Sequence, residues 1–310
     1  MDVVYLPGDG PVNEFGKILA SGDPARFSAS YMYDVSPVTD DRPFFFYTVQ
    51  PSDLWNYVRN ASHASADYKV NRAVPMLFGV FGVSIVATLL ILVLPRLLLG
   101  SRLPSDRSVL SFLWYFLFIG AGYILIQVAL IQKFVLFLGH PTYALTVIIF
   151  SMLVASGLGS FFSRPLIAEQ IDRLRWILPA VALLIALLAF VAAPLTAALV
   201  GLPLGVKMLI TVLLIAPAAF LMGMPFPTGL RVLEQVHHES VRWAWSLNAA
   251  SSVLGSATAI FLAIYIGLRS TLVVGGLFYL GALFAFLIAR PRLGRHVEVP
   301  LGPKAPAKLA

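Results

Sequence analysis

Long apolar segments fill the chain between residues 73 and 289. Each contains about 20 or more mostly apolar residues, the length of helix that crosses a hydrocarbon core of about 30 Å. A helix also satisfies its own backbone hydrogen bonds, as any segment in lipid must. The pattern therefore predicts an all-α integral membrane protein with seven transmembrane helices. We place them at residues 73–95, 109–131, 141–163, 176–200, 206–224, 244–266 and 270–289.

The segments outside this region follow a different pattern. Residues 3–6 predict one short strand that ends at a Pro-Gly turn, and residues 14–20 predict a short helix. One strand cannot close a sheet, and a segment this small buries little apolar surface. We therefore interpret residues 1–72 as a small extramembrane remnant of an α/β domain. Residues 290–310 are rich in Pro, Arg and Lys without apolar periodicity, so we expect a disordered basic tail.

Charged residues are few and unevenly distributed. They make up 12% of the chain, about half the usual fraction in soluble domains. Residues 1–72 contain nine acidic and six basic residues, whereas residues 73–310 contain six acidic and sixteen basic ones. Basic residues near helix ends anchor a protein at anionic headgroups, so this balance indicates membrane lipids as partners and no nucleic acid. The absence of cysteine excludes disulfides, thiolate metal sites and cysteine nucleophiles.

The Lys and Arg residues also predict an orientation. Seven helices divide the Lys and Arg residues of the connections, the tail and residues 59–72 into 13 on one side and six on the other. The positive-inside rule then places the C-terminus in the cytoplasm and residues 1–72 on the opposite side. One additional span would invert the N-terminal segment, and residues 131–140 are a candidate interfacial or re-entrant segment. Five aromatic residues near predicted helix ends are expected in the headgroup layer: Trp114, Tyr115, Trp176, Trp243 and Trp245.

A compact charged cluster precedes the first apolar segment. Asp40 and Asp41 are followed by Arg42, a proline and three phenylalanines. Adjacent carboxylates could share a proton or hold a cationic amine in catalysis. They could instead form a turn in which Arg42 pairs locally and the phenylalanines contact the membrane part. We favour the structural interpretation.

Polar residues within the apolar segments are further candidates. Gln127, Gln132 and Lys133 lie near the end of the second segment, and polar groups in lipid often mark function. We favour a structural role here too, with the glutamines bonded to neighbouring helices and Lys133 reaching the interface. His140 is expected to contact the start of the next helix, since no second ligand stands at metal-binding spacing. Asn248 is the most deeply placed amide and is expected to bond an adjacent helix.

The fifth apolar segment ends in a helix-breaking sequence. Residues 223–229 contain two prolines and two glycines, so the helix must break there. A broken helix can coordinate ions when it lines a cavity, as in transporters, but a simple exit turn explains the same residues. Arg231 and residues 237–239 follow, and we interpret them as a solvated face and not as a metal site, because consecutive residues point around a helix.

Two short runs of small residues recur in the third and sixth segments. Ser156 and Ser160 lie four residues apart, as do Ser252 and Ser256, which permits close helix packing. The copies lie three spans apart and hence in opposite orientations, so they would also suit an inverted repeat of the transporter type. We favour packing without a repeat.

Several motifs together resemble the membrane-bound, spermidine-synthase-like proteins of bacteria. They are the runs at residues 33–46, 137–141, 156–160, 222–227 and 243–248. The resemblance covers about residues 3 to 289. It implies a methyltransferase-like Rossmann domain, related to polyamine aminopropyltransferases, joined to helices in the bacterial inner membrane. It also implies binding of S-adenosylmethionine or its decarboxylated form.

The nucleotide-binding half of that domain has no counterpart in this sequence. The chain is expected to begin at the last strand of the domain, so the Gly-rich loop, the ribose-binding acid and the catalytic aspartate cannot be mapped. We therefore assign no catalytic, cofactor-binding or metal-binding residue. The predicted function is a membrane anchor and scaffold, as a non-catalytic subunit with protein partners in a larger membrane complex. The alternatives are a transferase completed by a Rossmann portion and a small-molecule transporter.

Overall fold

The computed structural model describes residues 16–17, 23, 37–44, 47, 73–98, 106–167 and 171–297. Contacts divide the chain into Met1–Val80 and Phe81–Ala310, a boundary inside the first long helix and beyond the predicted one at residue 72. The described residues form helices, turns and one isolated bridge, with no strand among them. The strand predicted at residues 3–6 lies outside the described residues, and Gly16 and Lys17 are helical, within the short helix predicted there.

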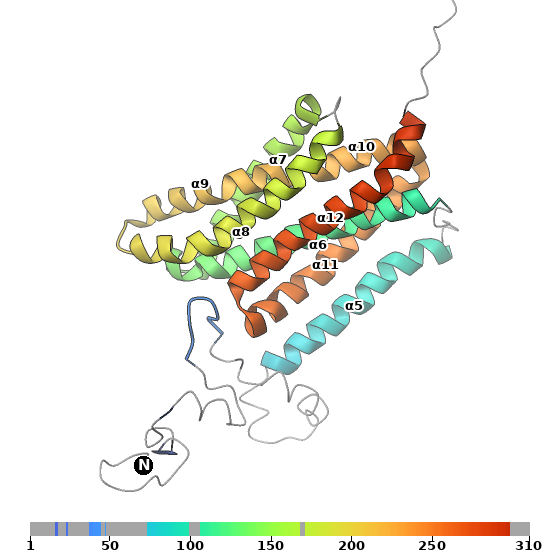
Figure 1. Cartoon of the computed structure of the whole chain (residues 1–310). Helices are drawn as coiled ribbons and strands as arrows, with labels where there is room; N and C mark the ends of the chain where they lie inside the picture. Colours follow the sequence, from blue (N-terminus) through green and yellow to red (C-terminus); the bar gives the residue numbers. More distant parts are fainter. Residues whose placement is uncertain are drawn as a thin grey trace, which may run out of the picture. The chain divides into compact units, whose positions relative to one another are not determined.

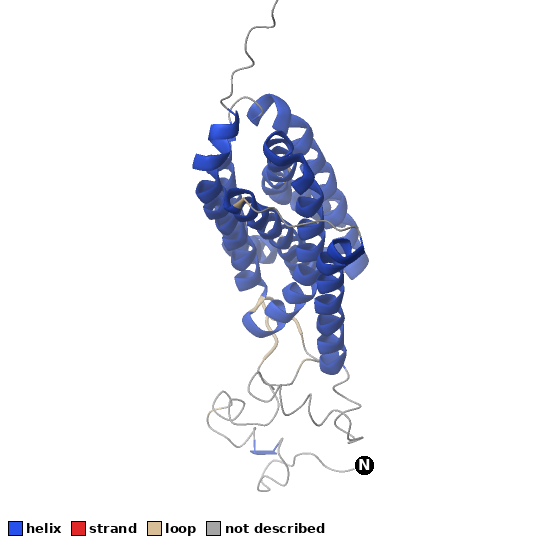
Figure 2. Cartoon of the chain, turned by 90° about the vertical axis from the view of Figure 1, so that its right-hand side faces the viewer, coloured by secondary structure: helices blue, strands red, loops and turns tan. Residues whose placement is uncertain are grey.

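Each of the seven predicted apolar segments coincides with a long helix (Figure 1). The helices are α5 (Ala73–Leu98), α6 (Arg107–Leu138), α7 (Pro141–Ile167), α8 (Leu174–Ala198), α9 (Leu204–Met222), α11 (Val241–Ile266) and α12 (Leu268–Val297). A short 3-10 helix, Ile171–Arg173, precedes α8. Figure 2 shows that helices account for nearly all of the described bundle.

Within the described residues, five helical stretches are long and apolar enough to cross a membrane, which fits a multi-pass membrane protein. They are Ser108–Leu138, Pro141–Ile167, Ile171–Ala198, Leu204–Ile266 and Leu268–Arg290. The fourth stretch has 63 residues and takes in α9, α11 and the shorter helix between them. The apolar part of α5, Met76–Leu90, is shorter.

The largest extensions beyond the predicted ends are those of α6 and α12. The 32 residues of α6 reach Leu138, about 48 Å at 1.5 Å per residue. Residues 131–138 are thus a continuation of α6, and the expectation of a separate re-entrant segment there is wrong. Helix α12 continues to Val297, although we predicted disorder from residue 290. Residues 298–310 lie outside the described part.

Local sequence explains both ends of α6. Asp106 is the N-cap, and its Oδ1 accepts hydrogen bonds from the backbone N–H of Ser108 at 2.8 Å and from its hydroxyl at 2.7 Å. Gly139 ends the helix with φ of 80°, a conformation that glycine adopts without steric cost. Helix α7 begins two residues later at Pro141.

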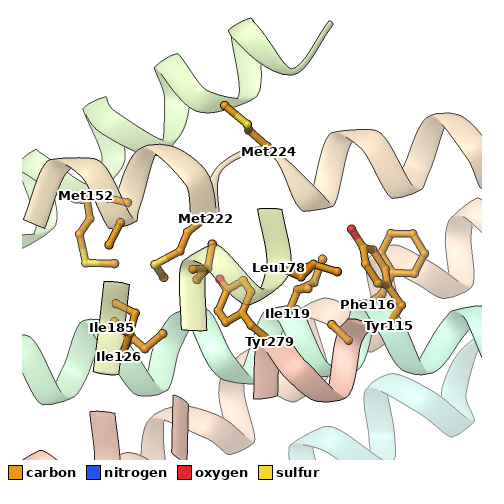
Figure 3. Packing of buried hydrophobic residues seen from close by; sticks show 14 of the residues in the cluster. Tyr115, Phe116, Ile119, Ile126, Met152, Leu178, Ile185, Met222, Met224 and Tyr279 are labelled. Carbon is orange, nitrogen blue, oxygen red and sulfur yellow. The ribbon is translucent and has the colours of Figure 1, made fainter. Parts of the chain in front are cut away.

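Helix α6 is the centre of the bundle. It packs most extensively on α12 and α11, and it also contacts α7, while α12 packs on α8 (Figure 1). The interior is filled by aromatic and aliphatic side chains, and Met222, Tyr279 and Ile185 converge there from three helices (Figure 3). From Phe81 onward, α5 has two side-chain contacts with α11: Phe81 stacks on Phe261, and the Thr88 hydroxyl donates to the Ala250 carbonyl at 3.3 Å.

The first run of small residues forms the crossing of α7 and α9. A Cβ added to Gly159 would lie 1.8 Å from the carbonyl oxygen of Phe220. A Cβ added to Gly223 would lie 2.0 Å from the carbonyl oxygen of Ser156. The two backbones therefore touch on both sides of one crossing, which confirms the predicted close packing.

The second run packs α11 on α6. A Cβ added to Gly255 would lie 2.6 Å from the side chain of Ile124, and the Ser252 hydroxyl approaches the Gly120 carbonyl at 3.4 Å. In both runs the close contact is made by a glycine, and the flanking serines lie beside it. Helix pairs in lipid depend on such van der Waals contact, because the hydrophobic effect does not drive them together.

Candidate functional site

The break predicted at residues 223–229 lies between two helices. Helix α9 ends at Met222, and α10 (Pro225–His237) begins after two residues. Pro225 has no N–H, so it cannot continue the hydrogen-bond ladder of α9. The backbone N–H of Gly223 donates instead to Ala219 at 3.1 Å, and that of Met224 donates to Leu221 at 3.2 Å. The last carbonyls of α9 are therefore used within the turn.

Two carbonyls at the junction of the turn and α10 also accept side-chain hydrogen bonds. The buried Tyr115 hydroxyl of α6 donates to the Pro225 carbonyl at 2.7 Å. The buried Thr228 hydroxyl donates to the Met224 carbonyl at 2.8 Å. A coordinated ion or substrate would have to compete with these internal donors. The break is thus stabilised from inside by a side chain of the central helix.

Aromatic side chains pack around this break. Phe226 makes edge-to-face contacts with Phe116 at 5.9 Å and with Trp245 at 4.7 Å between ring centroids. Gly229 allows α10 to approach α6, since an added Cβ would lie 2.6 Å from the Tyr115 ring. Figure 3 shows Tyr115 and Phe116 together on α6 below the start of α10. Helices α6, α10 and α11 therefore enclose the break.

Asn248 bonds a neighbouring helix, as predicted. Its side-chain Nδ2 donates to the Phe116 carbonyl of α6 at 3.2 Å. The contact is close because a Cβ added to Gly120 would lie 2.7 Å from the Asn248 carbonyl oxygen. Asn248 thus helps to hold α11 against α6, one turn beyond Trp245 and its contact with the break.

The polar residues near the end of α6 are not brought together with the break. His140 accepts a hydrogen bond at Nδ1 from the backbone N–H of Thr142 at 3.2 Å, so the predicted contact with the start of α7 is confirmed. Lys133 is 8% exposed, so most of its side chain is buried in the bundle. Gln127 and Gln132 are half-buried, and their amides make no hydrogen bond within the described part.

The acidic pair before the first helix lies in a tight turn. The backbone N–H of Arg42 donates to the Thr39 carbonyl at 2.9 Å, with Asp40 and Asp41 at the two central positions. Asp40 is exposed and Asp41 is half-buried. This geometry agrees with the structural interpretation of the cluster. Phe45 and Phe46 lie outside the described residues.

The polar stretch after the break is helical, whereas we expected a solvated loop face for residues 237–239. Helix α10 runs to His237 and is followed by a 3-10 helix, His238–Ser240. His238 and Glu239 are exposed, as expected, and His237 Nδ1 lies 3.0 Å from the Ser240 hydroxyl. No group of three metal-binding side chains occurs among the residues that could be described.

Sequence reasoning missed two contacts near the break. Tyr115 was expected in the headgroup layer, yet it is fully buried, and Trp243 is also buried. Trp114, Trp176 and Trp245 are exposed, in keeping with that expectation. Arg231 reaches Ser163 of α7, a contact that was not expected for a residue of a solvated face. A phenolic hydroxyl in an apolar helix needs a partner, which was the available signal for Tyr115.

Comparison with known proteins does not assign the chain to a family. No family model, curated protein or solved structure matches it.

Proposed function

We propose that this chain is a membrane anchor and scaffold, acting as a non-catalytic part of a larger membrane assembly. Its seven long helices are proposed to be seven spans, with α9 and α11 crossing separately within the 63-residue stretch. The sequence resemblance to spermidine-synthase-like proteins suggests the kind of assembly. The assignment to the bacterial inner membrane rests on the same resemblance.

The observation that carries the scaffold proposal is the internally bonded helix break. In a transporter, a broken helix presents unpaired backbone groups to a substrate cavity. Here the carbonyls of Pro225 and Met224 accept hydrogen bonds from Tyr115 and Thr228. Aromatic rings and a direct backbone contact close the surrounding space. Such an arrangement supports rigid packing better than alternating access.

A binding and reconstitution experiment tests this function. We expect calorimetry on the purified full chain in nanodiscs to detect no binding of S-adenosylmethionine or its decarboxylated form. We expect extraction in mild detergent to recover the chain with stoichiometric protein partners. Micromolar affinity for either cofactor would contradict the scaffold and favour the transferase. Substrate flux into proteoliposomes, lost in Pro225→Ala and Pro227→Ala, would instead favour a transporter.

The proposed orientation has a separate test. The chain has no cysteine, so single cysteines introduced at Ser52 and Ser101 can be labelled without background. Seven spans and the excess of basic residues predict that an impermeant thiol reagent added outside cells labels Ser52→Cys and not Ser101→Cys. Permeabilisation should then expose both positions. Labelling of Ser101→Cys in intact cells would contradict the cytoplasmic C-terminus.

A further inference from the structure

Two arginines from different helices lie beside each other near the end of α7. Arg231 of α10 donates from Nη2 to the Ser163 hydroxyl at 2.6 Å. That hydroxyl donates its own proton to the Ser160 carbonyl at 2.6 Å, so it can only accept from Arg231. Ser163 is fully buried, and the next residue is Arg164. The buried hydroxyl therefore fixes the guanidinium of Arg231 close to the base of Arg164.

Among the described residues, no carboxylate pairs with either of these two positive charges. Arg231 contacts Ser163, and Ser163 is adjacent to Arg164 in the chain, so the two like charges lie in the same part of the structure. Neither forms an ion pair within the described part of the chain, whereas Arg290 pairs with Asp172. A guanidinium has five N–H donors, so most of those of Arg231 remain available beyond the Ser163 contact. Holding two such groups together is favourable when an anion binds both.

The surroundings of this pair match the headgroup layer of a membrane. Helix α10 buries one face against the bundle and exposes Glu234 and Gln235, the pattern of a helix at an interface. Arg164 is exposed three residues before the end of α7, and Arg231 is half-exposed. The indole ring of Trp245 packs on Phe226 of α10 and is itself exposed. Exposed tryptophans are enriched at headgroup depth.

We propose that Arg164 and Arg231 form a binding site for the phosphate of an anionic phospholipid headgroup, with Ser163 positioning the guanidinium of Arg231. Guanidinium groups match phosphate oxygens with paired hydrogen bonds, which a lysine cannot reproduce. Two guanidiniums beside one phosphate also repel the choline of a zwitterionic lipid, so the site favours anionic headgroups. The proposal requires that the chain lies in a membrane, and it does not depend on the scaffold function.

Native mass spectrometry of the delipidated full chain tests this site. The protein is titrated with phosphatidylglycerol or phosphatidylcholine, and inorganic phosphate is added as a competitor. We expect tighter binding of phosphatidylglycerol, and about tenfold or greater weakening in the double variant Arg164→Ala, Arg231→Ala, because charge-assisted hydrogen bonds are lost. The matched control is Arg175→Ala, Arg242→Ala, which removes two exposed arginines from the first turns of α8 and α11. It should keep the wild-type preference.

Three results would overturn the proposal. Equal weakening in the control would mean that general positive charge attracts the lipid. Equal binding of the two lipids would exclude a preference for anionic headgroups, and displacement by millimolar phosphate would indicate a site for soluble anions. If the alanine double variant does not fold, Arg164→Lys with Arg231→Lys keeps the charge. Weakened phosphatidylglycerol binding in that variant supports the site, and unchanged binding refutes it.

Discussion

Gly159→Ala is expected to destabilise the protein more than any other single methyl group added to α7. The new Cβ would lie 1.8 Å from the Phe220 carbonyl oxygen, which belongs to the backbone and cannot rotate away. Helices α7 and α9 would have to separate, and overpacking of this kind costs about 1–3 kcal/mol or more. Thermal unfolding in detergent, followed by tryptophan fluorescence, should show a clear decrease in melting temperature.

The same helix provides a matched control. Gly157 lies two residues earlier, and a Cβ added there would meet no atom within 4 Å. Because alanine favours a helix by about 1 kcal/mol over glycine, Gly157→Ala should leave the melting temperature unchanged or raise it. Similar destabilisation by the two variants would show that α7 and α9 do not cross in the way described.

Leu153→Arg is expected to prevent stable membrane insertion of much of the protein. Leu153 is 59% exposed and lies near the middle of the 27 residues of α7. In a water-soluble protein an arginine at such a position would be tolerated. At the centre of a membrane-spanning helix it costs roughly 2.5–3.5 kcal/mol. The measurement is the fraction of expressed protein that remains in carbonate-washed membranes.

Leu166→Arg is the control for this insertion experiment. Leu166 is also exposed, at 42%, but it lies in the last turn of α7 beside Arg164. An arginine there can reach the headgroups, so insertion should remain close to that of the wild-type protein. If Leu153→Arg inserted as well as Leu166→Arg, α7 would not face lipid at its centre.

The positions of the long helices could be predicted because length and apolar character are local properties. The seven predicted segments differ from the observed helices mainly at their ends, as in α6 and α12. Helix α10 was not predicted, because the prolines at 225 and 227 indicated a break and the polar residues after it resembled a loop. Proline is tolerated in the first turn of a helix, which is where both residues lie.

The contacts between helices could not be predicted in the same way. In a membrane, the helix face that contacts protein and the helix face that contacts lipid are both apolar, so hydropathy does not reveal which helices are neighbours. The runs of small residues showed where close contact was allowed, yet the partner of Gly159 is a backbone group 61 residues away, at Phe220. The Arg231 contact likewise depends on how α10 leaves the break. The hydrogen bond of Asn248 to a neighbouring helix was easier to predict, because an amide deep in the membrane requires a hydrogen-bond partner.

The crossing of α7 and α9 limits how the bundle can move. Gly159 and Gly223 press backbone on backbone at two points along the same contact, so sliding by even one residue would drive Cβ atoms into carbonyl oxygens. Gly223 also begins the turn into α10, so the position of α10 is tied to the same contact. A rearrangement of this protein would therefore move α7, α9 and α10 together as one rigid unit and would leave the contacts between these helices unchanged.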